Sequence, residues 1–240
     1  MSERILKEQL EAWNQKPALR FLYKQWFRTI QEHLVPGLTL EVGGGIGRLK
    51  EYLPELITLD IENTPWTDIV ADAKALPVKK ESFNNIVLFD VLHHLPRPVL
   101  FFRQAERALA PGGRILIMDP YASPASSMVY RFFHPEPLSF DCDPYNEQKP
   151  LSSDIPFDSN QAAATIMFFR QRRKWNEMFP NLKVTKRSRT ALFAYPLTGG
   201  FGGKPYLPEP CILFVAWAEK YLRFLAPVFA FRTFIVLSKQ

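Results

Sequence analysis

Residues 39–47, Thr-Leu-Glu-Val-Gly-Gly-Gly-Ile-Gly, are the stretch of this chain best suited to hold a ligand. A short apolar strand is expected at 39–42, the glycines follow directly, and a helix-compatible segment occupies 48–53. A strand that turns sharply through glycine leaves backbone N–H groups uncovered and lets a ligand touch the main chain. The sequence therefore predicts a ligand-binding turn after this strand.

The spacing of the glycines separates two kinds of nucleotide-binding turn. A dinucleotide-binding turn has the spacing Gly-x-Gly-x-x-Gly, which seats a pyrophosphate. Counted from Gly43, that pattern requires glycine at position 48, where this chain has Arg48. The spacing present is Glu-x-Gly-x-Gly-x-Gly, from Glu41 through Gly43 and Gly45 to Gly47. It resembles the cofactor-binding turn of class I S-adenosylmethionine-dependent methyltransferases.

Motifs further along the chain keep the order seen in that family. Five motifs follow one another: a strand ending in an acid (57–60), Ala-Asp-Ala-x-x-Leu-Pro (71–77), Ser-Phe-x-x-Ile-Val (82–87), Leu-His-His-Leu (92–95) and Leu-x-Pro-Gly-Gly-Arg (109–114). The ordered set covers residues 37–120, about a third of the chain, and resembles the small-molecule, type 11-like branch of the family. One departure is Asn84, where relatives often carry Asp.

The alternation of short strands and helices implies a mostly parallel sheet covered by helices. The resemblance implies a Rossmann-like α/β fold whose seven-stranded, mostly parallel sheet has an antiparallel last strand, with helices on both faces and added cap insertions. Further strands are expected at 68–73, 115–118, 179–184 and 233–237, and helices at 99–109 and 160–179. Asp158, Ser159 or Asn160 is expected to cap the last of these helices.

The resemblance also implies S-adenosyl-L-methionine as the cofactor. Asp60 lies about twenty residues beyond the strand and its glycines, where an acid can accept both ribose hydroxyls, and Glu62 is the next candidate. Asp72 and the Ala73 backbone are expected at the adenine. The full set of expected cofactor-binding residues is Glu41, Gly43, Gly44, Gly45, Gly47, Asp60, Ile61, Asp72, Ala73, Phe89 and Asp90.

We expect one methyltransferase domain over 1–240, with an N-terminal helical segment (1–36), a cofactor-binding core (37–120) and two insertions (121–160 and 190–230). Residues 120–160 contain seven prolines, which disfavour long regular elements and favour an extended segment. About forty residues separate the last two expected strands. Both insertions are expected to form a substrate cap over the carboxyl ends of the strands.

Two segments allow more than one interpretation. Apolar residues from Leu19 to Leu34 recur at helical spacing after Pro17, so this helix packs on the sheet edge, covers the cofactor as a lid or lies on a membrane. Residues 170–189 hold eight basic side chains and one acid in a chain of net charge +6. They form either a solvated surface or an anion-binding face for phosphate-bearing substrates, nucleic acid or acidic lipid.

Four residues are candidates for catalysis on the acceptor side: His134, Asp119, Tyr121 and His94. His134 lies within the expected cap and is the first choice for a general base, because imidazole titrates near neutral pH. Asp119 and Tyr121 follow a strand and are placed to orient an acceptor. His93 and His94 follow another strand, where packing is an equally good interpretation, and His33 is expected to be structural.

Composition excludes several other classes. Cys142 and Cys211 lie far apart and form no metal-binding pair or disulfide framework, so no metal is expected and a reducing, cytoplasmic location fits. The N-terminus lacks the apolar segment of a secretory signal. The apolar stretch 211–231 contains Glu219, Lys220 and Arg223, so no transmembrane segment is expected.

Three functions remain open. The leading one is methyl transfer by in-line displacement to a small-molecule, lipid-type or saccharide-type acceptor, with peripheral membrane contact left open. The second is methylation of RNA or protein through the basic 170–189 window, although nucleic acid is not the favoured partner. The third is a catalytically silent, methyltransferase-like binding partner. The intact Glu41, Gly43, Gly45, Asp60 and Asp72 argue against it, because such a partner needs no cofactor-contacting groups.

Overall fold

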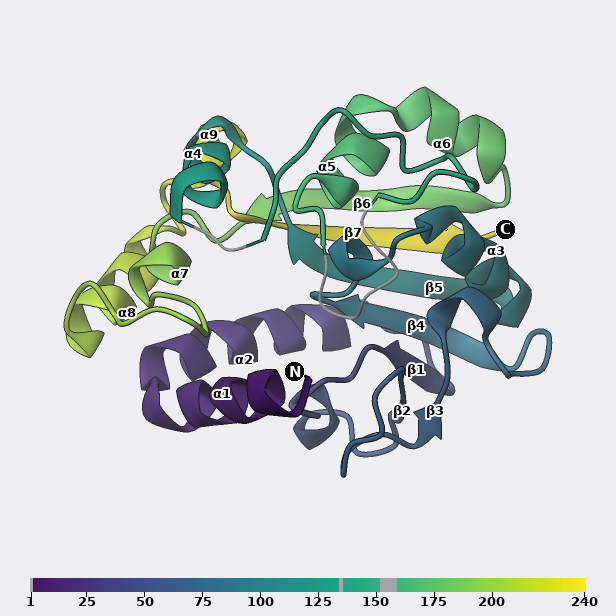
Figure 1. The fold of residues 1–240 in the computed structure, drawn as a ribbon, viewed down its shortest axis with the longest axis horizontal. Helices are drawn as coiled ribbons and strands as arrows, with labels where there is room; N and C mark the ends of the chain where they lie inside the picture. The colour runs from purple at the N-terminus through teal and green to yellow at the C-terminus, as the bar shows by residue number, and fades with distance from the viewer. Residues whose placement is uncertain (1, 134–135, 152–158) are drawn as a thin grey trace.

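The computed structural model describes residues 2–133, 136–151 and 159–240 (Figure 1). Its described residues contain a seven-stranded sheet in the order β3-β2-β1-β4-β5-β7-β6. The strands are β1 (Thr39–Val42), β2 (Ile57–Asp60), β3 (Ile69–Val70), β4 (Phe83–Phe89), β5 (Leu109–Pro120), β6 (Leu182–Thr190) and β7 (Arg232–Lys239). Neighbours from β3 to β5 pair in parallel, and β7 pairs antiparallel with β5 and β6. The predicted Rossmann-like sheet is confirmed.

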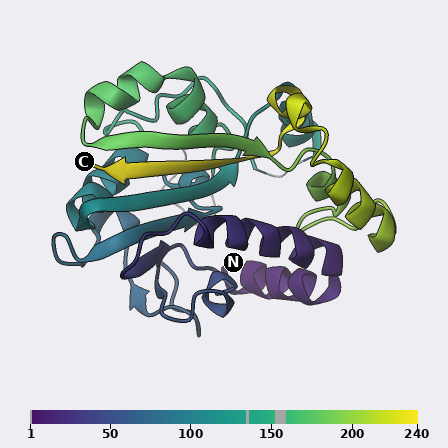
Figure 2. The same ribbon diagram turned by 180° about the vertical axis from the view of Figure 1, so that it is seen from behind.

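Helices cover both faces of this sheet, as predicted (Figures 1 and 2). Successive residues of a strand point to opposite faces. In β4, Ile86 and Leu88 therefore join the core beneath α3 (Pro98–Ala108), whereas Val87 joins the core beneath α2 (Pro17–Gln31), which α1 (Ser2–Gln15) precedes. The buried side of α2 shares its core with residues of β4, β5 and β7, so this helix packs on a face of the sheet and not on its edge.

Two elements are shorter in the structure than the sequence predicted. The expected helix at 48–53 is a single 3₁₀ turn, Leu49–Glu51, because Pro54 follows and disfavours helical backbone in the residue before it. The expected strand at 68–73 is only Ile69–Val70. Asp72 ends it, because its side chain accepts a hydrogen bond from the Lys74 N–H (2.8 Å) and caps a 3₁₀ turn at Ala73–Ala75.

The expected helix at 160–179 is divided into α5 (Ala163–Thr165), a π-helical turn (Ile166–Arg170) and α6 (Arg172–Met178). In the π turn the Gln171 N–H donates to the Ile166 carbonyl (2.8 Å). The wider turn leaves the Met167 carbonyl to accept a hydrogen bond from the Tyr145 hydroxyl (3.0 Å). A hydroxyl from a distant loop thus replaces an α-helical hydrogen bond, which periodicity alone does not reveal.

The proline-rich segment contains one helix that was not predicted, α4 (Pro124–Phe133). Its first residue is a proline, a residue that the first helical turn accepts without losing a hydrogen bond. Ser123 and Ser126 cap it reciprocally: the Ser126 N–H donates to Ser123 Oγ (3.1 Å) and the Ser123 N–H donates to Ser126 Oγ (2.8 Å). The expectation of an extended segment without long regular elements was therefore wrong for 124–133.

Both expected insertions contribute to one helical lobe, at the left end of Figure 1. It contains α4, α7 (Ala194–Leu197), α8 (Glu209–Ala218), a 3₁₀ turn (Arg223–Leu225) and α9 (Ala226–Phe229). The segment with α4 follows the carboxyl end of β5, and the segment with α7 follows that of β6. Parallel strands end at the same edge of a sheet, so the lobe lies at the edge that also bears the glycine turn.

The core beneath α6 supports a stability prediction. Trp175 is 1% exposed, packs against Phe102 and Phe179, and donates from Nε1 to the Leu182 carbonyl (3.0 Å). We expect Trp175→Ala to lower the free energy of unfolding by about 3–5 kcal/mol in urea titrations. Trp217, which is 52% exposed on α8, is the matched control, and Trp217→Ala should stay within about 0.5 kcal/mol. Equal losses would contradict the assignment of Trp175 to the core.

Candidate cofactor and acceptor site

The turn after β1 has the backbone that its glycines predict. Gly43, Gly45 and Gly47 have φ of 74°, 50° and 67°, in the left-handed region that favours glycine. A Cβ atom built on Gly45 would meet no atom within 4 Å, so the space above this residue is open. The Gly45 N–H donates to Asp60 Oδ2 (3.0 Å), which joins the turn to the end of β2.

Asp60 lies where a ribose-binding acid is expected. Its Oδ1 accepts a hydrogen bond from the Glu62 N–H (3.0 Å) and its Oδ2 accepts the one from Gly45. A carboxylate offers about four acceptor positions, so two remain for hydroxyl donors. Ile61 follows it and is exposed beside the same turn. Asp60 therefore combines a fixed position with free acceptor capacity.

Glu41 is a buried carboxyl group, and its Oε2 has no hydrogen-bond partner. Burial raises the pKa of Glu41 to about 8, the nearby Asp60 carboxylate adds to this, and Lys50 opposes it. Buried polar atoms without partners are rare and call for a donor. The open space at Gly45, the acceptors on Asp60 and the unpartnered Glu41 together fit an adenosyl ligand that carries hydroxyl and ammonium donors.

The remaining expected cofactor residues already have partners within the protein. Asp72 caps the turn at 73–75, which includes Ala73, and its carboxylate also lies 3.4 Å from Lys74 Nζ. The Phe89 ring packs between aromatic side chains of α2. Asp90 has a left-handed φ of 58° and accepts a hydrogen bond from the Tyr23 hydroxyl at Oδ2 (3.0 Å). The cofactor contacts of these residues stay predictions, as do those of Glu41, Asp60, Ile61 and the glycine turn.

Arg232 is a buried cation that the sequence interpretation missed. It forms an ion pair with Asp90 through NH2, and its guanidinium stands over the rings of Trp26 (4.5 Å to the centroid) and Tyr195 (5.2 Å). The ion pair joins the end of β4 to the start of β7. The sequence did contain a signal for it: Arg232 stands directly before the apolar run 233–237, and a charge next to a buried strand needs a buried partner.

His93, Asp119 and Glu136 form a charged cluster at the carboxyl ends of β4 and β5. His93 Nδ1 lies 2.9 Å from Asp119 Oδ1, and Nε2 lies 3.5 Å from Glu136 Oε2. Burial disfavours the charged ring, but the Asp119 and Glu136 carboxylates outweigh it and raise the pKa of His93 to about 10. His93 is therefore held between two carboxylates, and both of them favour its protonated form.

Of the four predicted catalytic residues, the structure places Asp119 and His94 at this cluster. Asp119 is hydrogen-bonded to His93, and the ring of His94 lies 4.1 Å from that of His93. Tyr121 is buried against Phe169, with 4.8 Å between ring centroids. His134 lies outside the described residues. Glu136 was missed, since 42 positions of sequence separate it from His94 and nothing in its neighbours suggests the contact.

Comparison with known proteins identifies the family of the chain and agrees with its fold. Residues 18–182 match the family described as "Methyltransferase domain". A SAM-dependent methyltransferase of Thermotoga maritima, described as a possible histamine N-methyltransferase, has a TM-score of 0.58 and 16% identity, over 99% of this chain and 98% of its own. A SAM-dependent methyltransferase of Archaeoglobus fulgidus has a TM-score of 0.56 and 13% identity, over 92% of this chain and 94% of its own.

One curated relative adds a sequence match. An uncharacterised protein of Methanocaldococcus jannaschii is 30% identical over 104 residues, which cover 40% of this chain and 51% of that protein. The match thus spans about half of the length of this relative.

The fold and the glycine turn define a class I S-adenosylmethionine-dependent methyltransferase, and S-adenosylmethionine is its cofactor. Since the family match covers more than half of its residues, the chain belongs to the methyltransferase domain family.

Cofactor binding at the turn gives a paired prediction. Gly45→Val puts a branched side chain into the open space above the turn, and we expect S-adenosylmethionine affinity in calorimetry to fall on the order of a hundredfold, about 2.7 kcal/mol. Gly112 is the matched control, because it has a left-handed φ of 72° and equally open surroundings but lies at the opposite edge of the sheet. Gly112→Val should bind like the parent, and an unchanged Gly45→Val affinity would move the cofactor elsewhere.

The buried Glu41 gives a pH prediction. Between its ordinary pKa of 4.5 and the native value of about 8, the native state binds more protons than the unfolded state, so stability falls as pH rises through this window. Glu41→Gln removes the ionisation and should flatten this fall in urea titrations without cofactor. At pH 8 we expect a gain of roughly 1–3 kcal/mol over the parent. Glu55→Gln, at an exposed glutamate, is the control. If the free energy of unfolding of Glu41→Gln changed with pH as that of the parent does, the raised pKa of Glu41 would be refuted.

Proposed function

We propose that this chain transfers the methyl group of S-adenosylmethionine to an amphiphilic small-molecule acceptor, lipid-linked or saccharide-bearing, which reaches the site from a membrane surface. The observation that carries the proposal is the exposed apolar surface of the helical lobe. In the described part of the chain, no helix is long and apolar enough to cross a membrane. The proposed contact is therefore peripheral.

Large apolar side chains on the lobe point into solvent. Together they are Met128, Phe132, Phe133, Phe214, Trp217, Tyr221, Phe224 and Val228, and the exposed fraction of Phe133 reaches 80%. Scattered apolar residues are ordinary on a protein surface, whereas many large exposed apolar side chains on one lobe indicate a contact with a partner or a membrane. The proposal assigns these side chains, together called the lobe surface, to a membrane.

Helix α8 has the apolar composition of a buried helix, but most of its residues are not buried. Apolar residues occur on all its sides, yet Ile212 is its one fully buried residue. Trp217 packs its ring against Phe214 (5.7 Å between centroids) and Tyr221 (5.4 Å), so the exposed rings form one group. Trp and Tyr favour the membrane–water interface, because their rings are apolar and their N–H or O–H groups remain hydrated.

The charges near the lobe surface suit an anionic membrane. Arg131, Lys220 and Arg223 are exposed on the same lobe. Glu219 is turned inward, where its Oε1 accepts hydrogen bonds from the backbone N–H groups of Phe193 (2.6 Å) and Ala194 (2.5 Å). The cations therefore remain available to phosphate headgroups, which attract basic side chains near a bilayer surface.

The proposed reaction needs positioning more than covalent chemistry from the protein. When bound, S-adenosylmethionine would supply the methyl group of its sulfonium: an acceptor nucleophile would form a bond to the methyl carbon in line as the C–S bond breaks and S-adenosylhomocysteine leaves. In this proposal Glu41 and Asp60 hold the cofactor, the lobe excludes water, and Asp119, Tyr121 or His94 orients the acceptor. Correct positioning alone supplies about 7–11 kcal/mol of the barrier reduction.

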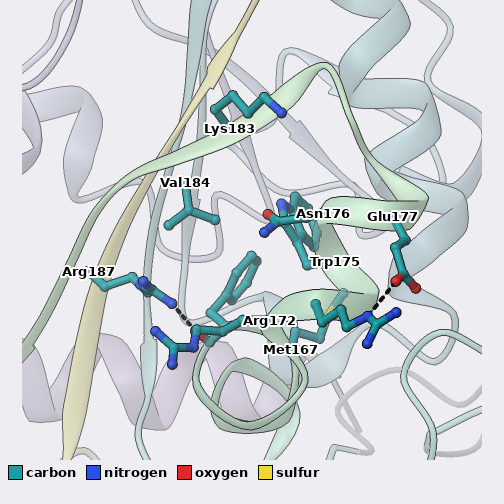
Figure 3. A pocket seen from close by; sticks show the side chains of 10 residues that line it. Met167, Arg172, Trp175, Asn176, Glu177, Lys183, Val184 and Arg187 are labelled. Atoms are coloured by element: carbon teal, nitrogen blue, oxygen red, sulfur yellow. Dashed lines mark hydrogen bonds and ion pairs between the residues drawn. The ribbon is translucent and has the colours of Figure 1, made fainter.

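The alternative acceptors, RNA or protein, depend on the basic 170–189 window. Part of this window lines a hollow of about 690 Å³ beside β6, with Arg172, Lys183 and Arg187 around it (Figure 3). Four strand spacings, about 19 Å, separate β6 from β1, and Lys183 lies at the amino end of β6. The hollow is therefore remote from the glycine turn, which favours the lobe as the acceptor side.

Methyl transfer from labelled S-adenosylmethionine tests the proposal. With vesicles of the source's total lipid extract, we expect label in the organic-soluble fraction. Trp217→Ser combined with Phe224→Ser should reduce both vesicle binding and label transfer at least about tenfold, about 1.4 kcal/mol, since each exposed ring contributes apolar contact area. Cofactor affinity should not change. Phe21→Ser is the matched control, because Phe21 is exposed on α2 outside the lobe.

Two results would contradict the proposal. Label found in added RNA, with strong dependence on salt, would favour the basic window as the acceptor site. Vesicle binding that is equal in the lobe variant, the Phe21→Ser control and the parent would show that the lobe surface does not dock on lipid.

A further inference from the structure

We propose that His93, His94 and Glu136 form a binding site for a divalent transition-metal ion on the acceptor side of the sheet. Each of the three side chains offers one ligand atom, and these atoms lie within 4.8 Å of one another. The two histidines stand on the 3₁₀ turn after β4 (Leu92–His94), and Glu136 comes from the segment after α4.

The orientation of His93 is the first argument. Asp119 accepts the Nδ1 hydrogen of His93, which leaves Nε2 on the side of Glu136, where a bound metal ion would take the place of the Nε2 proton. A carboxylate on one ring nitrogen fixes the tautomer and increases the basicity of the other, an arrangement that most metal-bound histidines have. Asp119 is fully buried at the end of β5 and His93 is almost as buried, so the ring has little freedom to turn away.

The orientation of Glu136 is the second, independent argument. Its Oε2 accepts hydrogen bonds from Ser159 Oγ (3.0 Å) and from Gln161 Nε2. Ser159, Asn160 and Gln161 are three consecutive polar residues that are at least 98% buried. The Asn160 N–H also donates to the His93 carbonyl (2.8 Å), which joins this stretch to the histidine turn. Both sides of the cluster are thus held by buried hydrogen bonds, as ligands of a metal usually are.

The spacing of the ligand atoms is close to what an ion needs. Bonds of about 2.0–2.2 Å keep any two ligands of one ion within about 4.3 Å. The three ligand atoms lie within 4.8 Å of one another, so small movements of the side chains are enough to complete the site. Two imidazoles and one carboxylate suit zinc, iron or nickel better than magnesium or calcium. Three protein ligands leave at least one coordination position for water or for an acceptor oxygen, as in catalytic metal sites.

Metal binding by the full chain tests this site without an activity assay. After removal of metal with a chelator, calorimetric titration with Zn²⁺ should show one ion per chain, and Co²⁺ should give the visible absorption of a nitrogen-ligated ion. We expect His94→Ala and Glu136→Gln each to weaken Zn²⁺ affinity at least about tenfold, and Asp119→Asn to weaken it by about 10–100-fold.

The controls separate this site from adventitious binding. His33→Ala removes a histidine whose Nδ1 is hydrogen-bonded to the Thr29 carbonyl (2.7 Å) far along the chain from the cluster, and it should bind like the parent. Circular dichroism identifies any variant that fails to fold, and His94→Gln then replaces His94→Ala. The proposal is overturned if the parent takes up no ion. It is also overturned if the cluster variants keep the parent's affinity, since the free thiols Cys142 and Cys211 would then be the ligands.

Discussion

The ion pair between Asp90 and Arg232 is the interaction on which the arrangement of the site depends. It joins the end of β4 to the start of β7, and the Tyr23 hydroxyl ties α2 to the same carboxylate. The guanidinium stands among aromatic rings from α2, β4 and α7. Loss of one partner from a buried pair leaves an uncompensated charge, which costs about 3–5 kcal/mol. Three layers of the protein are therefore positioned around one pair of charges.

The sheet edge carries two electrostatic environments. One contains Asp60 and the buried Glu41, whose pKa is raised to about 8 by burial. The other contains His93, whose protonated form is favoured by the Asp119 and Glu136 carboxylates. The basic window lies apart from both. Four of its cations stand on β6, the outer strand, where charged side chains prevent pairing with other chains, and the other four lie in the π-helical turn and α6.

The parts of the fold that depend on local sequence were predictable, and those that depend on distant partners were not. The turn from Glu41 to Gly47 and the strands around it follow from glycine geometry and apolar runs. The division of the helix expected at 160–179 depends on a hydrogen bond from the Tyr145 hydroxyl. Helix α4 depends on two serines that cap its first turn, which begins at a proline. In the site, His94 and Asp119 were recognisable as isolated candidates. Their neighbour Glu136 and the cation Arg232 were not, because only the folded chain brings them close.

The place of β7 has a consequence for folding during synthesis. The strands from β1 to β5, with the glycine turn, are complete by residue 120, so the cofactor half can form its parallel sheet early. β7 lies between β5 and β6, yet it is made last, after the lobe. β6 and β7 therefore pair only when the roughly forty residues between them have left the ribosome. Contacts between residues so far apart in sequence form slowly. Until then the β5 edge stays open, and the nascent lobe, with its exposed aromatic residues, is the part of the chain most in need of protection by a chaperone.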